Sequence, residues 1–200
     1  MGWNTYYDKT AGRKPRQLLV KALDEHIPAN FVETRHAAAD IGCGSGIETA
    51  FLIDRGWDVL AIDKEVIAIR RLKAHIKLNE HLQTQIAPFE AMTLPDKLDL
   101  VYAGYSLPFC HPEHFSTMWN NITTSIAEGG YFVGEFFGER DFWATNPEWT
   151  FNTAIETRLL FTDFEILFFH ERDSAGQATS GDKHWHVFSV IARKLASKDS

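Results

Sequence analysis

Two kinds of apolar spacing alternate along the chain and predict strands and helices in turn. Short apolar runs of the kind found in buried strands occupy residues 36–41, 57–62, 98–103, 131–138, 164–170 and 184–193, and residues 83–87 are interpreted as a further short strand. Apolar residues recur at helical spacing in residues 15–26, 46–54, 65–81, 113–127 and 151–161. Strands that alternate with helices are typical of an α/β protein with a largely parallel sheet.

Three segments between these elements have no clear periodicity. An aromatic leader precedes residue 15, and it could pack along an edge of the fold or close over a ligand pocket. Residues 139–148 are polar and aromatic and follow the fifth predicted strand, where a loop rises on the ligand side of such a sheet. Residues 171–183 contain Gly and Ser, and we expect a mobile connection there.

A glycine turn links the first predicted strand to the next helix. Gly42, Gly44 and Gly46 stand at alternate positions, and Asp40 lies two residues ahead of them. Glycine reaches backbone angles closed to other residues and lets a ligand approach the chain. The helix N-terminus beyond it favours an anionic group. The second strand is followed by Asp63, which is placed to accept hydrogen bonds from the two hydroxyls of a ribose.

The G-x-G-x-G spacing differs from the G-x-G-x-x-G of dinucleotide-binding proteins. Together with Asp40 and Asp63 it resembles motif I and the following strand of the class I S-adenosylmethionine-dependent methyltransferases. The resemblance covers residues 36–138. It implies a three-layer, Rossmann-like, doubly wound sheet of seven strands, mostly parallel with the last strand antiparallel. It also implies S-adenosylmethionine as the cofactor.

The same resemblance implies which residues contact the methyl donor. The glycine turn would hold its methionine end, with Asp40 near the ammonium group, and Asp63 would bind the ribose. Glu90 and Ala91 stand before a Leu-Pro, where the family's adenine contacts lie, although the family's usual acid is Asp and a surface turn is the alternative. The full set of expected donor contacts is Asp40, Gly42, Cys43, Gly44, Gly46, Asp63, Lys64, Glu90, Ala91, Ala103, Gly104 and Tyr105.

The methyl acceptor is less well defined by the sequence. Residues 6–15, 105–109 and 183–186 resemble small bacterial enzymes known as tellurite-resistance-like methyltransferases, which implies a small acceptor with a sulfur, oxygen or chalcogen nucleophile. The Asp/Asn-Pro-Pro-aromatic signature of enzymes that methylate base amines is absent. We expect acceptor contacts from Tyr6, Tyr105, Arg140, Trp143 and Trp185.

Three histidines near the last two strands are candidates for a general base. His170, His184 and His186 should gather at the rim of the site if the last strand is antiparallel, and imidazole titrates near neutral pH. Alternation along the strand would place His184 and His186 on one face and Trp185 on the other. A purely structural role is the alternative, and a thiolate acceptor would need no base.

Length and composition fit one soluble domain. We divide residues 1–200 into an N-terminal lid or helix (1–30), a cofactor-binding core (36–138) and an acceptor-side segment (139–193). A net charge of −7 gives no attraction to nucleic acid, and the basic clusters at 13–16 and 70–73 are interpreted as solvated helix faces or ends. No apolar run approaches the roughly 20 residues of a membrane span, and the N-terminus lacks the apolar core of a signal peptide, so we expect a cytoplasmic protein.

Cys43 and Cys110 form no C-x-x-C pair, so we expect neither a metal site nor a disulfide framework. Two alternatives to a methyltransferase remain from the sequence. A nicotinamide-dependent oxidoreductase should show the wider glycine spacing. A catalytically silent domain could bind S-adenosylmethionine as a sensor or partner module.

Overall fold

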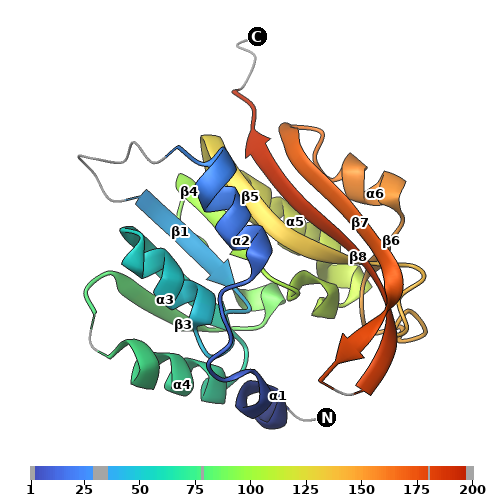
Figure 1. Cartoon of the computed structure of the whole chain (residues 1–200). Helices are drawn as coiled ribbons and strands as arrows, with labels where there is room; N and C mark the ends of the chain where they lie inside the picture. The colour runs from blue at the N-terminus through green and yellow to red at the C-terminus, as the bar shows by residue number, and fades with distance from the viewer. Residues whose placement is uncertain (1–2, 29–35, 78, 180, 197–200) are drawn as a thin grey trace.

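An eight-stranded sheet forms the centre of the protein (Figure 1). The computed structural model describes residues 3–28, 36–77, 79–179 and 181–196. The strands are β1 (His36–Ile41), β2 (Trp57–Asp63), β3 (Leu82–Ile86), β4 (Leu98–Ala103), β5 (Ile126–Gly138), β6 (Phe151–Asn152), β7 (Phe164–Ala178) and β8 (Gly181–Lys194). They lie in the order β3-β2-β1-β4-β5-β8-β7, and the two-residue β6 pairs with β5.

The sheet is doubly wound, as the sequence predicts. Strands β1 to β5 pair in parallel, whereas β8 is antiparallel to both β5 and β7. The order reverses between β1 and β4, which creates a crevice at the carboxyl ends of these two strands where such sheets bind ligands. The short β6 is an addition to the seven predicted strands.

Helices cover both faces of the sheet (Figure 1). They are α1 (Trp3–Thr10), α2 (Gln17–Lys21), η1 (Ala22–His26), α3 (Ile47–Asp54), α4 (Val66–Ile76), η2 (Phe89–Ala91), η3 (Leu107–Phe109), α5 (Pro112–Ser125) and α6 (Ala154–Leu159). The alternation along β5 divides the core. Phe132 and Phe136 pack with α5, while Val133 packs with α2 and α3 on the other face. No helix within the described ranges is long and apolar enough to cross a membrane.

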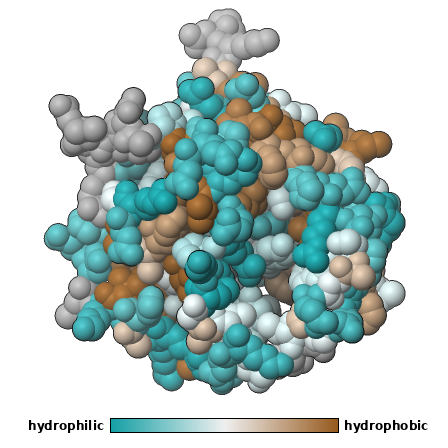
Figure 2. Space-filling model, in the orientation of Figure 1, coloured by the Kyte–Doolittle hydropathy of each residue, from teal (hydrophilic) through white to brown (hydrophobic). Residues whose placement is uncertain are grey.

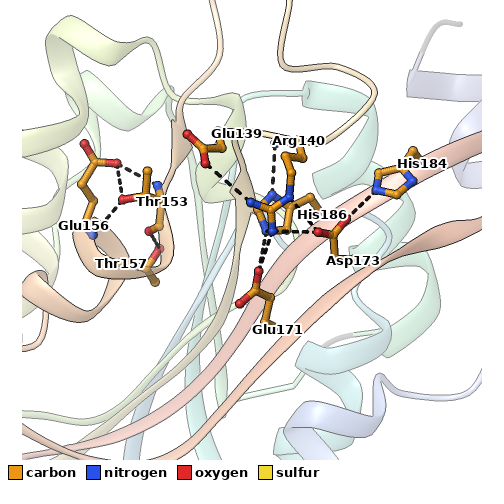
Figure 3. Close-up of polar contacts among 9 residues, drawn as sticks. All are labelled: Glu139, Arg140, Thr153, Glu156, Thr157, Glu171, Asp173, His184 and His186. Carbon is orange, nitrogen blue, oxygen red and sulfur yellow. Dashed lines mark hydrogen bonds and ion pairs between the residues drawn. The ribbon is translucent and has the colours of Figure 1, made fainter.

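Two helices are shorter than predicted. The helix expected over residues 65–81 ends at Ile76, because Lys77 takes a left-handed backbone angle (φ 58°) that stops the helix. The helix expected over residues 151–161 spans only Ala154–Leu159. Its first residues pair with β5 instead, and Thr153 then caps the helix in a reciprocal capping box with Glu156 (Figure 3).

The expected mobile connection over residues 171–183 is wrong. Strand β7 continues to Ala178 and β8 begins at Gly181, so the two strands form a hairpin that extends beyond the core. The apolar pattern stops at residue 170 because the outer part of the hairpin faces water. The backbone pairing between β7 and β8 continues without it, from Glu171 opposite Phe188 to Ala178 opposite Gly181.

The aromatic leader forms a helix, α1, which the sequence pattern did not predict. Its Trp3 ring lies edge-on to Phe109, with centroids 5.2 Å apart, and Tyr7 is buried. This packing places α1 over the carboxyl ends of the central strands rather than along an edge of the sheet. Residues 1–2 and 29–30 of the predicted N-terminal segment lie outside the described residues.

Candidate functional site

The glycine turn has left-handed backbone angles at all three glycines, with φ of 74° at Gly42, 54° at Gly44 and 84° at Gly46. A Cβ on Gly42 would lie 2.3 Å from Cβ of Ser106, and one on Gly46 would lie 2.6 Å from Leu72. These two glycines are therefore required by packing within the protein. At Gly44 there is more room, and a Cβ would approach the Tyr7 ring to 3.4 Å.

The turn is joined directly to the acid at the end of β2. Gly44 donates its backbone N–H to Oδ2 of Asp63 (2.9 Å), and Glu65 donates its N–H to Oδ1 (2.8 Å). Burial raises the pKa of Asp63, while these two hydrogen bonds favour its charged form. Each carboxylate oxygen has a second lone pair for a further donor, so Asp63 can still accept hydrogen bonds from a ligand.

Asp40 lies deeper, below the turn. It is fully buried and accepts a hydrogen bond from the Thr49 hydroxyl (2.6 Å). Burial raises its pKa to about 7, and the nearby Glu48 and Asp63 add to the rise. Cys43, between two of the glycines, is also buried, and burial raises the pKa of its thiol.

Two arginines from the N-terminal segment reach into the same region. Arg13 binds both carboxylate oxygens of Glu48, at 2.5 and 2.7 Å, and the Arg16 backbone N–H donates to Glu48 as well (3.0 Å). The Arg16 guanidinium donates to the Tyr6 hydroxyl (3.1 Å) and lies 4.4 Å above the Tyr105 ring. The interpretation of residues 13–16 as a solvated helix end is therefore wrong for both arginines. The buried acid Glu48, in the first turn of α3, required a cationic partner that the sequence pattern did not reveal.

A small cavity separates α1 from the glycine turn. Its volume is about 40 Å³, and its walls include Tyr6, Tyr7, Arg13, Arg16, Glu48 and Tyr102. Ligand pockets for molecules of cofactor size occupy roughly 300–1,000 Å³. The observed cavity is smaller than such pockets, and α1 covers it.

The residues predicted for the adenine and for the end of β4 border this region. Glu90 and Ala91 are exposed on η2, the short helix that follows β3. Between β3 and η2, Ala87 donates its backbone N–H to the Asp63 carbonyl (3.2 Å). Lys64 is exposed after β2. Ala103 is buried at the end of β4. Gly104 and Tyr105 follow, and Tyr105 has a left-handed backbone angle (φ 56°), which is uncommon for a residue with a side chain.

Four of the five predicted acceptor contacts form one aromatic group. The Trp185 ring lies 6.0 Å from Tyr105 and 5.8 Å from Trp143, and Arg16 links Tyr105 to Tyr6. The surface is hollowed between the N-terminal segment and the β7–β8 hairpin (Figure 2).

A buried ion pair supports the two tryptophans. The Lys183 ammonium lies 3.3 Å from the Trp143 ring centroid and 3.8 Å from that of Trp185, and it binds Asp141 at 2.7 Å. Both charged side chains are almost completely buried, with exposures of 1 % and 0 %. Burial lowers the pKa of Lys183, and Asp141 opposes this change. The sequence analysis identified neither residue, because a buried ion pair leaves no periodic signal.

Arg140 and the predicted histidines lie elsewhere (Figure 3). His184 and His186 share one face of the hairpin, opposite Trp185, as the alternation predicts. His184 pairs with Asp173 (2.5 Å) and His186 with Glu171 (2.9 Å), and Arg140 binds both acids. His170 is exposed on β7, with its ring stacked 6.3 Å from Phe168. The structure therefore does not bring Arg140 or these imidazoles together with the aromatic group.

Glu171, Asp173 and His186 lie close enough to hold a metal ion, but their hydrogen bonds fit an ion-pair cluster better. Nδ1 of His186 accepts the backbone N–H of Arg140 (3.0 Å), and Nε2 lies 2.9 Å from Oε1 of Glu171 and 3.1 Å from the Arg140 guanidinium. A histidine that binds a metal usually donates from its other nitrogen. The cluster fastens the loop after β5 to the hairpin.

Comparisons with known proteins place this geometry in a family. The family model of tellurite resistance protein TehB matches residues 19–184. A search of curated protein sequences found no match.

Solved structures of low sequence identity share the fold. TehB from Haemophilus influenzae superposes with a TM-score of 0.74 at 19 % identity, over 96 % of this chain and 67 % of that one. A S-adenosylmethionine-dependent methyltransferase from Methanosarcina mazei gives 0.67 at 21 % identity, over 84 % and 96 %. The N-methyltransferase NodS from Bradyrhizobium japonicum, in complex with S-adenosylhomocysteine, gives 0.69 at 15 % identity, over 97 % and 98 %.

The family match spans most of the chain, and both the doubly wound sheet and its antiparallel last strand agree with these structures. The chain belongs to the TehB family and has the fold of the class I S-adenosylmethionine-dependent methyltransferases.

Proposed function

We propose that the protein transfers the methyl group of S-adenosylmethionine to a sulfur, oxygen or chalcogen atom of a small molecule. The observation that carries the proposal is the hydrogen bond from Gly44 to Asp63, which joins the glycine turn after β1 to the acid at the end of β2, beside the crevice between β1 and β4. Methyl transfer is an in-line displacement at a sulfonium carbon. The protein's main task is therefore to align the two reactants and exclude water.

The residues around the cavity fit the methionine end of this donor. The Nε atom of Arg13 is buried and has no hydrogen-bond partner within the described residues, so it can donate to a carboxylate. Gly44 presents a backbone without a side chain. Asp40 and Glu48 add negative charge for an ammonium group. Asp63 would bind the ribose hydroxyls, and Glu90 with Ala91 would meet the adenine.

Helix α1 is the lid over the donor site. This is one of the two roles that the sequence allowed for the aromatic leader. A cavity of about 40 Å³ is too small for the donor, so α1 must move away before the donor enters. Tyr7 and Trp3 would then close over the bound donor and exclude water from the reacting atoms.

The acceptor would lie against Tyr105, Trp143 and Trp185. Arg16 above Tyr105, and Arg172 at 5.6 Å from the Trp185 ring centroid, add positive charge that favours an anionic or soft nucleophile. The predicted role of His170, His184 or His186 as a base gains no support, because His184 and His186 bind acids on the opposite face of the hairpin. A cytoplasmic location stays a prediction.

Calorimetric titration with S-adenosylmethionine, S-adenosylhomocysteine and NAD tests the donor site. We expect the first two to bind, and the Asp63→Ala change to weaken both about tenfold or more, as for the loss of hydrogen bonds to a charged group. Asp96→Ala, at an exposed position in the loop before β4, is the matched control and should bind like wild type. Absence of binding, or tighter binding of NAD, would contradict the proposal.

A further inference from the structure

A buried glutamate on β5 has no role in the function described so far. Glu135 is 3 % exposed and lies on the face of β5 that packs under α2. Because Ala103 pairs with Gly134, Glu135 is level with Gly104, the first residue beyond the end of β4. One of its oxygens accepts the backbone N–H of Tyr105, and the other, Oε2, has no partner within the described part of the chain.

A second unsatisfied polar atom lies beside it. The hydroxyl of Tyr102, on the neighbouring strand β4, is also buried without a hydrogen-bond partner among the described residues. A Cβ on Gly104 would lie 2.2 Å from this hydroxyl, and both Tyr102 and Gly104 line the cavity. A buried donor or acceptor without a partner destabilises the folded protein. Tyr102 thus brings one such atom to the cavity wall, and Glu135 lies behind it on the neighbouring strand, which indicates a place where a polar group binds.

Charged groups from several elements surround Glu135. Arg16 and Arg13 come from the N-terminal segment, Glu48 from α3, and Tyr102 and Tyr105 from β4 and its end, while β8 presents Ser189 opposite. Burial raises the pKa of Glu135 to about 7, Glu48 adds to the rise, and the two arginines oppose it. A carboxylate in this range can both accept and release a proton at neutral pH.

Resting on the proposed function, we propose that Oε2 of Glu135 is the general base that takes the proton from the acceptor. The Tyr102 hydroxyl is then the second polar group that contacts the acceptor. The acceptor then binds in its protonated form, as a hydroxyl or thiol. Glu135 lies on the same face of β5 as Phe137, whose ring contacts Tyr105 and Trp185. The imidazoles of His184 and His186 lie on the other face.

The proposed step balances in atoms and charge. The X–H bond of the acceptor breaks and its proton passes to Glu135. The electron pair left on X forms the new bond to the methyl carbon. The pair of the breaking carbon–sulfur bond returns to sulfur, which gives neutral S-adenosylhomocysteine. Glu135 ends as a carboxylic acid and releases its proton to water when α1 opens.

Carboxyl NMR on protein labelled with ¹³C-glutamate tests the position of Glu135 without any acceptor. The signal lost in Glu135→Gln identifies the residue, and Glu165→Gln, an exposed glutamate on β7, is the matched control. We expect S-adenosylmethionine, whose sulfonium is positive, to lower the titration midpoint by about 0.5 unit or more. Neutral S-adenosylhomocysteine should not lower it. An equal effect of both ligands would overturn the proposal, whereas calorimetry that detects neither ligand would contradict the proposed function itself.

Turnover with tritiated methyl donor tests the proton transfer. With catechol, a protonated hydroxyl acceptor, Glu135→Gln should lower kcat about 100-fold and remove the rise of activity between pH 6 and 8. With 4-nitrothiophenol, which is already ionised, it should change kcat less than about threefold. Equal losses with both probes, or an unchanged pH profile, would overturn the role of Glu135. If neither probe is methylated, the NMR titration decides alone.

Discussion

Asp40, Asp63 and Glu135 show how the position of a single carboxyl decides its chemistry. Asp63 meets two backbone N–H groups at a strand end and Asp40 meets one hydroxyl in the interior. One oxygen of Glu135 has no hydrogen-bond partner among the residues that the structure describes. The first two could be predicted, because each stands at the carboxyl end of an apolar run. Glu135 could not be predicted as a site residue. It stands inside the nearly continuous apolar run of residues 131–138, and nothing in that run shows that its side chain is buried.

Replacing Asp40 by Asn should change the pH dependence of stability. The Asp40 pKa is about 7 in the folded protein and 3.8 in the reference state. Between these values the unfolded chain loses this proton while the folded chain keeps it, so the wild-type free energy of unfolding falls as pH rises to about 7. Above pH 7 this contribution is constant.

Urea denaturation at pH 5 and pH 8 measures the effect. The stability of Asp40→Asn relative to wild type should improve by about 2 kcal/mol between pH 5 and pH 8, because only the wild type has this titration. All other groups titrate in both proteins and cancel. A difference that is the same at both pH values would show that Asp40 titrates normally.

At the scale of elements, the site is assembled by segments that have weak sequence signals. Helix α1, the loop after β5 and the outer hairpin each carry few periodic apolar residues, yet they hold Tyr7, Trp143 and Trp185. Each is fixed by contacts to another segment. The clearest is the ion pair of Lys183 with Asp141, which joins the hairpin to the loop after β5. Such contacts between distant residues leave no trace in a local pattern.

Removing the Tyr7 ring should loosen the α1 lid. Tyr7 covers Gly44 and contacts Trp3 and Tyr6, with ring centroids 6.4 and 5.8 Å away. In Tyr7→Ala the closed form loses these contacts, so we expect the donor to associate about tenfold faster. Tyr7→Phe keeps the ring and should associate like wild type. Stopped-flow tryptophan fluorescence measures the rate, and equal rates for Ala and Phe would show that α1 is not the barrier to entry.

Removing the Lys183 ammonium should destabilise the protein strongly. Lys183→Met leaves the charge of Asp141 buried without its cation, which typically costs about 3–5 kcal/mol. The double variant Lys183→Met/Asp141→Asn removes both charges and should recover part of this loss. Lys14→Met, at an exposed position, should change the free energy of unfolding by less than about 0.5 kcal/mol. Additive losses in urea denaturation would show that the two residues are not coupled.

At the scale of the whole molecule, the sheet brings the residues proposed for the donor and for the acceptor to one edge. The carboxyl ends of β1, β2 and β4 hold the glycine turn, Asp63 and Tyr105, and the antiparallel β8 brings Trp185 beside them. The N-terminal segment closes this edge from outside. A ligand bound between these parts contacts both the core and the lid, so its binding stabilises the folded chain as a unit.

S-adenosylmethionine should therefore raise the melting temperature. At a concentration 100 times its Kd, a ligand that binds only the folded chain adds about 2.7 kcal/mol, which corresponds to about 5–10 °C for a protein of this size. S-adenosylhomocysteine should act similarly, and NAD should have no effect. Differential scanning calorimetry measures the shift. A shift with NAD alone would contradict the assignment of the donor.

The sequence by itself predicted the alternation of strands and helices, because burial of β1, β2, β4 and β5 imposes apolar runs. The family, the doubly wound sheet and the antiparallel last strand followed from the resemblance that the glycine turn carries together with Asp40 and Asp63. The sequence also identified Tyr6, Tyr105, Trp143 and Trp185, which the fold brings together.

Only the tertiary structure decided the position of α1 over the cavity, the length of the hairpin and which face of the hairpin carries the aromatic group. It also decided the partners of Arg13, Arg16, Lys183 and Glu135. The physical reason is the same in each case. These features depend on contacts between residues far apart in the chain, whereas periodicity reports only which positions of a single segment are out of water.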